Sequence, residues 1–124
     1  MKVLIDTHLL LWALASPGKL SSKARQRIDS SEVFASAASI WEISIKSALG
    51  KLQANPAEVL SGIEPAGFDH LHITGEHAAE VANLRHLHKD PFDRLLVAQA
   101  LVEDMILLTD DAALGNYGDC VEVV

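Results

Sequence analysis

Four carboxylates occupy places where an apolar strand should end or a helix should begin. They are Asp6, Glu42, Asp93 and Asp111. In a sheet of parallel strands such places face one edge, so the four side chains are expected to share one patch. Neighbouring carboxylates repel one another unless a cation binds them, and Mg²⁺ prefers oxygen ligands. The pattern predicts one or two Mg²⁺ or Mn²⁺ ions and metal-assisted phosphodiester chemistry.

The elements that must position these acids form a regular alternation. Short apolar runs alternate with amphipathic segments, which predicts a three-layer α/β/α domain with a central parallel sheet, spanning residues 1–124. The expected strands are 3–5, 32–35, 68–73, 105–108 and 121–124. The expected helices are 8–15, 23–29, a helix capped by Ser36 or Ser39 that ends at Leu49, 56–61, 75–86 and 92–103.

Each acid has a defined place in that alternation. Asp6 directly follows the first strand, and Asp111 follows the strand at 105–108. Glu42 is expected in the first turn of its helix, and Asp93 is the third residue of another. The positive end of a helix dipole favours a carboxylate there. For any one acid, a helix cap or a turn is the simpler explanation; their joint placement at one edge favours a site.

Composition and charge limit the classes of function. The net charge of -7 argues against a broad basic surface for nucleic acid, but an enzyme can meet phosphates through bound metal. The single cysteine, Cys120, cannot form an intrachain disulfide, which fits a reducing compartment. No apolar run is long enough to cross a membrane, so a cytoplasmic protein is expected.

Four segments resemble one known family. They are Val3-Leu4-Ile5-Asp6-Thr7-His8, Ser39-Ile40-Trp41-Glu42-Ile43, the block from Asp90 to Ala100 (DPFDRLLVAQA), and Leu108-Thr109-Asp110-Asp111. In this order they resemble the PIN-domain proteins, and most of all the VapC-type toxins of bacterial toxin–antitoxin pairs. The resemblance extends over essentially the whole chain, and the Asp90 block is its most specific part.

The resemblance implies a Mg²⁺- or Mn²⁺-dependent endoribonuclease that cuts RNA. It also implies a homodimer that a cognate antitoxin protein silences. We expect the dimer to form through apolar helix faces and a basic antitoxin segment to reach into the acidic site.

The resemblance also assigns roles by position. Asp6, Glu42 and Asp93 match the three core acids of the family, and Asp111 matches the fourth, with Asp110 as its nearest competitor. Thr109 matches a hydroxyl residue near the site, and Thr7 is expected to act similarly. Asp90 is expected to cap a helix, although it lies close enough to Asp93 to contribute to the site.

Two cationic residues are candidates for binding substrate phosphate or for balancing the acids. They are Lys46 and Arg94. Lys46 lies four residues after Glu42, and this spacing on a helix predicts an ion pair between them.

Two other interpretations stay open at this point. His86-x-His88-x-Asp90 has the spacing of a zinc ligand motif in metallo-β-lactamase-like hydrolases. A receiver-like signalling domain would also gather acids and Mg²⁺ at a sheet edge, without catalysis. His70, His72 and His77 share no ligand spacing and are expected to be partly exposed.

Overall fold

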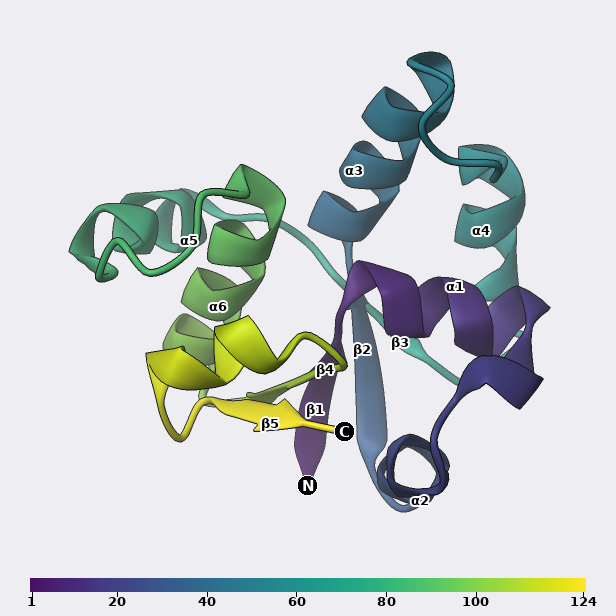
Figure 1. The fold of residues 1–124 in the computed structure, drawn as a ribbon, viewed down its shortest axis with the longest axis horizontal. Coiled ribbons are helices and arrows are strands. Elements are labelled where there is room, and N and C mark those ends of the chain that lie inside the picture. Colours follow the sequence, from purple (N-terminus) through teal and green to yellow (C-terminus); the bar gives the residue numbers. More distant parts are fainter.

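The computed structural model describes all residues, 1–124. Its centre is a sheet of five parallel strands in the order β3-β2-β1-β4-β5 (Figure 1). The strands are β1 (Lys2–Ile5), β2 (Glu32–Ser36), β3 (Asp69–Leu71), β4 (Ile106–Thr109) and β5 (Val121–Val123). The parallel sheet is as predicted. Its order differs from the 2-1-3-4-5 order of receiver domains, so the receiver-like alternative is wrong.

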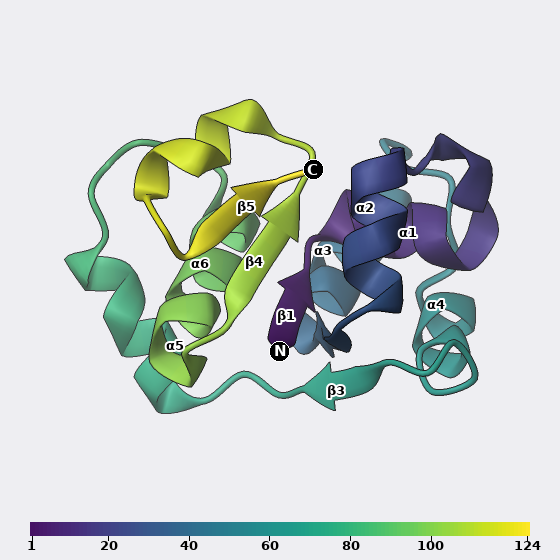
Figure 2. The same cartoon turned by 90° about the horizontal axis from the view of Figure 1, so that it is seen from below.

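Six α-helices surround the sheet. They are α1 (Thr7–Ala15), α2 (Ser22–Asp29), α3 (Ala37–Ala48), α4 (Pro56–Gly62), α5 (Gly75–Glu80) and α6 (Pro91–Glu103), with 3₁₀ turns at Pro17–Lys19, Val81–Asn83 and Ala112–Tyr117. Figure 2 shows α1, α2 and α4 on one side of the sheet and α5 and α6 on the other. None of the helices combines the length and the apolar character that a membrane span requires.

The core has two halves because β1 is buried on both faces. Val3 and Ile5 belong to a cluster that includes Leu9 of α1 and Val59 of α4. Leu4, between them, belongs to a second cluster built largely from α6. Side chains of successive strand residues point to opposite faces, so this continuous apolar run fixes the sheet between two helical layers.

The start of α3 corrects one prediction about Glu42. The Ser36 side chain accepts a hydrogen bond from the Ala38 amide, so Ser36 and not Ser39 caps the helix. Glu42 is therefore the sixth helical residue and lies in the second turn. α3 rises directly from the end of β2 (Figure 1), and the Glu42 side chain accepts a hydrogen bond from Thr7, which follows Asp6.

The helix predicted over residues 75–86 is much shorter than expected. α5 ends at Glu80, and residues 84–90 form an irregular segment. His77, expected at the surface, is fully buried, whereas Ala78 and Ala82 are exposed. His77 is held by Thr74 in a capping box. Because His77 takes the inward position, Ala78 and Ala82 lie on the outer face.

Candidate functional site

Asp6 stands where β1 passes into α1 at the carboxyl edge of the sheet. The side chain caps α1, because its Oδ1 accepts a hydrogen bond of 2.8 Å from the Leu9 amide. Its Oδ2 accepts a hydrogen bond of 2.5 Å from the hydroxyl of Thr109, the last residue of β4. Only 4% of Asp6 is exposed. Both oxygens are thus oriented by the backbone and by the neighbouring strand.

Burial dominates the acidity of Asp6. It raises the pKa to about 6, against the opposing effect of the hydrogen bonds from Thr109 and Leu9. The charge of Asp110 raises the pKa further. A carboxylate that is costly to ionise here is one that a bound cation would stabilise in its charged form.

Glu42 reaches the same edge from α3 and is also only 4% exposed. The Thr7 hydroxyl donates a hydrogen bond of 2.7 Å to Glu42 Oε1, and the Ser39 hydroxyl lies 2.9 Å from the Thr7 hydroxyl oxygen. Lys46 Nζ donates to Glu42 Oε2 at 2.5 Å. Both carboxylate oxygens of Glu42 therefore have protein donors.

Of its two predicted roles, Lys46 has that of balancing the negative charge of the acids. Besides the ion pair with Glu42, its ammonium group lies 3.7 Å from Asp90 Oδ2. Burial lowers the pKa of Lys46, but the hydrogen bond and charge of Glu42, with the charges of Asp90 and Asp93, outweigh this and raise it. The ion pair predicted from the spacing along the helix is present.

Asp93 is the third residue of α6 and lies among like charges. Burial, followed by the charges of Asp90 and Glu42, raises its pKa to about 7, and Asp6 adds to the increase. Asp90 is the predicted helix cap, since its side chain accepts from the amides of Phe92 and Asp93. The mutual repulsion indicates that acids from β1, α3 and α6 converge.

Asp111 joins this group through His88 and Thr109, whereas Asp110 acts on Asp6 through its charge. The Asp111 amide donates to the Thr109 hydroxyl oxygen at 3.1 Å, the same hydroxyl that donates to Asp6. Its Oδ1 caps the following 3₁₀ turn through the Ala113 amide. Asp110 is exposed. Thr109 therefore links the acid after β1 to the acid after β4.

The structure also places His88 beside the acids, whereas the sequence analysis considers His88 only within the alternative zinc motif. His88 Nε2 lies 3.3 Å from Asp111 Oδ2 and 3.6 Å from Asp93 Oδ2. Ligand atoms of these three residues lie within 4.8 Å of one another, so by distance alone they could share one ion. His86 is exposed and Asp90 is a cap, and the three residues of the alternative zinc motif, His86, His88 and Asp90, are not brought together as a group of ligands.

Arg94 is held away from the acids, which corrects its predicted placement. Its guanidinium group donates to the carbonyl oxygens of Val81 and Arg85 at 3.1 and 3.0 Å. It also lies 3.2 Å from the hydroxyl of Tyr117. Arg94 forms no ion pair with a site acid and instead fixes the irregular segment before α6.

The donor set fits a hard divalent cation. Asp6, Asp93 and Asp111 present carboxylate oxygens at one edge, and Glu42 lies beside them with its charge balanced by Lys46. The raised pKa values of Asp6 and Asp93 indicate that their charged forms lack compensation in the free protein. Oxygen-rich sites of this kind suit Mg²⁺ or Mn²⁺.

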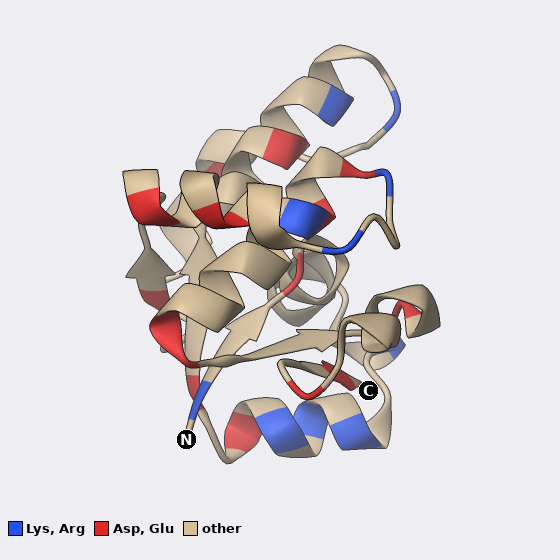
Figure 3. Ribbon diagram, turned by 90° about the vertical axis from the view of Figure 1, so that its left-hand side faces the viewer, with Lys and Arg blue, Asp and Glu red and all other residues tan.

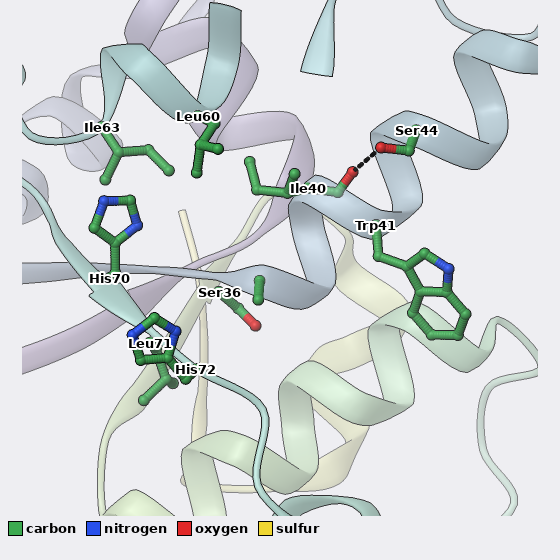
Figure 4. A pocket seen from close by; sticks show the side chains of 10 residues that line it. Ser36, Ile40, Trp41, Ser44, Leu60, Ile63, His70, Leu71 and His72 are labelled. Atoms are coloured by element: carbon green, nitrogen blue, oxygen red, sulfur yellow. Dashed lines mark hydrogen bonds between the residues drawn. The ribbon is translucent and has the colours of Figure 1, made fainter. Parts of the chain in front are cut away.

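A pocket of about 280 Å³ lies apart from the acids, between α3, α4 and β3 (Figure 4). Ile40, Leu60 and Ile63 line it, and His70 and His72 stand at its other side. Trp41 is 52% exposed, and its side chain points away from these histidines. The walls of this pocket are mostly apolar and include none of the four acids.

Comparisons with known proteins agree with this geometry. The family described as PIN domain matches residues 3–119. Ribonuclease VapC22 of Mycobacterium tuberculosis is 31% identical over 120 residues, which are 93% of this chain and 91% of that protein. Two solved structures share the fold. VapBC2 of Rickettsia felis, bound to a promoter DNA fragment, has a TM-score of 0.71 at 12% identity and covers 100% of this chain and 99% of that one. FitAcB of Neisseria gonorrhoeae has a TM-score of 0.66 at 22% identity, covering 98% and 95%. The family match over most of the chain and the similarity to the relative from Mycobacterium tuberculosis show that the chain belongs to the PIN-domain family.

Proposed function

We propose that the chain is a metal-dependent endoribonuclease and the toxin of a toxin–antitoxin pair in the cytoplasm. The observation that supports the proposal is that the charges of Glu42 and Asp6, after burial and the charge of Asp90, raise the pKa of Asp93 to about 7, while Asp111 lies near Asp93 on the other side of His88. The relative from Mycobacterium tuberculosis, named a ribonuclease, supports the choice of RNA as the substrate.

In phosphodiester hydrolysis these residues would have three roles: holding the metal, orienting other side chains and accepting a proton. Asp6, Asp93 and Asp111 would hold one or two Mg²⁺ or Mn²⁺ ions, which when bound stabilise charge on the attacked phosphate and make water more acidic. Thr109 fixes Asp6 and Asp111 relative to each other. Thr7 and Lys46 orient Glu42, and a carboxylate of the group accepts the proton of the attacking water.

Two kinds of protein partner belong to the proposal. A solved structure of similar fold from Klebsiella pneumoniae is named a toxin–antitoxin complex, which supports a cognate antitoxin for this chain. A groove of about 690 Å³ between α1 and α4, lined partly by Trp12 and Val59, offers room for an apolar antitoxin segment. Exposed apolar residues of α3 and of its C-cap, among them Trp41 and Leu49, suit contact with a second copy in a homodimer.

The test is cleavage of a mixed RNA pool by the purified protein with Mg²⁺ or Mn²⁺ and then with EDTA. We expect cutting to require the metal and to fall by about 100-fold or more in Asp6→Asn, since even residues that only orient metal ligands cost about 10- to 100-fold. Asparagine can still cap α1, so the fold is retained.

The matched control is Asp29→Asn, an exposed aspartate at the end of α2. This variant should cut as the wild type does. If wild type and Asp6→Asn cut equally, the activity comes from a contaminant and the proposed function is refuted.

A further inference from the structure

His88 lies at the acidic edge, although a metal site built from carboxylates does not require a histidine there. Its ring lies against Asp93 and Asp111 at 3.6 and 3.3 Å. Its side chain is 19% exposed, so a molecule arriving from solvent can reach it. A histidine so close to two acids is either a metal ligand or a hydrogen-bond donor.

The hydrogen bond at the other ring nitrogen decides between these roles. The Asp90 amide lies 3.2 Å from His88 Nδ1 and donates to it. A backbone N–H can only donate, so Nδ1 carries a lone pair and the ring proton sits on Nε2. Nε2, the atom that faces Asp93 and Asp111, therefore presents N–H and has no lone pair free for a metal ion.

The other nitrogen donors nearby have fixed partners. Lys46 is paired with Glu42 and Asp90. Arg94 is bound to the carbonyl oxygens of Val81 and Arg85. The His88 N–H, in contrast, faces carboxylates whose charge a cation would neutralise, and a phosphate oxygen beside them would then be the better acceptor.

We propose that His88 is a substrate-binding residue that donates its Nε2–H to a backbone phosphate oxygen of the RNA and is not a metal ligand. The inference rests on the proposed function and deepens it. It needs no charge on the ring, because the neutral tautomer already presents the donor. It also gives an acidic protein a phosphate contact at the place where phosphate must bind.

The experiment compares His88→Leu, which removes the donor, with His88→Gln, whose amide keeps one. His86→Leu is the matched control, because His86 is exposed on the same segment. For each variant, KM and kcat for an RNA strand are measured, and Mn²⁺ affinity is measured by calorimetry without RNA.

We expect His88→Leu to raise KM about 10-fold, the effect of one lost hydrogen bond to a charged group. Its Mn²⁺ affinity should stay within about twofold of wild type, whereas losing a ligand would cost far more. His88→Gln should recover most of the loss in KM, and His86→Leu should behave as wild type.

Two results would overturn the inference. One is a large loss of Mn²⁺ affinity in His88→Leu, which would make His88 a ligand; the other is an unchanged KM. If the wild type does not cut RNA, the proposed function fails on its own account. The role of His88 is then tested by measuring how tightly the wild type and His88→Leu bind RNA in the presence of Ca²⁺. Weaker binding by His88→Leu sustains the inference, and equal binding, or no binding by the wild type, overturns it.

Discussion

At the scale of single residues, Thr109 controls the ionisation of Asp6. Its buried hydroxyl donates to Asp6 Oδ2 and opposes the effect of burial on the pKa. We expect Thr109→Val to raise the pKa of Asp6 above about 6 and to lower the free energy of unfolding by roughly 1–3 kcal/mol, because a buried acceptor loses its partner. Thr109→Ser, which keeps the hydroxyl, should change neither. Carboxyl NMR titration and urea unfolding measure both effects, and an unchanged Asp6 pKa in Thr109→Val would contradict this role.

The residues that could be predicted were those fixed by the end of an element. Asp6 and Asp111 follow strands, so their place at the carboxyl edge depends only on locating β1 and β4. His88 lies in a segment without periodicity, and its position depends on the Asp90 amide and on packing against α6. Arg94 was placed on the right helix, but its partners come from distant parts of the chain, which spacing does not encode.

At the scale of elements, buried His77 joins α5 to α6. Its Nδ1 accepts from the Thr74 amide at 3.0 Å, and its Nε2 lies 2.7 Å from Glu103 Oε2. We expect His77→Leu to lower the free energy of unfolding by roughly 2–4 kcal/mol, since it leaves several polar groups without partners. His72→Leu, at an exposed position, should change it by less than about 0.5 kcal/mol. Urea unfolding of both variants provides the measurement, and equal effects would show that the His77 network adds no stability.

Elements that begin with strong local signals were predicted well. Asn55-Pro56 and Asp90-Pro91 mark the starts of α4 and α6 because an N-cap and a proline both act within one turn. The end of α5 had no such signal. The helix ends at Glu80, and the carbonyl oxygen of the next residue, Val81, accepts from Arg94, a contact with α6 that the sequence of α5 does not contain.

At the scale of the whole molecule, charge is distributed against general RNA binding. The net charge is -7, and several of the few cationic residues lie on α2, shown at the bottom of Figure 3. Two of these cationic side chains contact β5, since Lys23 donates to the Val123 carbonyl oxygen and Arg27 pairs with Glu122. RNA affinity should therefore depend on contacts at the acidic edge and on the shape of the target, with a weak dependence on salt.

The same charge distribution makes the metal-free protein sensitive to pH. Asp93 and Asp6 have pKa values of about 7 and about 6 in the folded state, above their ordinary values, so the folded protein binds more protons than the unfolded chain between about pH 4 and pH 7. Stability must fall as pH rises through this range, by on the order of 2 kcal/mol after screening by solvent. Asp93→Asn should flatten the dependence of stability on pH.

Metal binding displaces these protons from Asp6 and Asp93, so Mn²⁺ should raise the unfolding temperature more at pH 8 than at pH 5. Thermal unfolding of both proteins with EDTA and with Mn²⁺ measures each effect. A metal-free wild type that gains stability from pH 5 to pH 8 would show that the acids are already compensated within the protein, and the argument for a cation at this edge would lose its energetic basis.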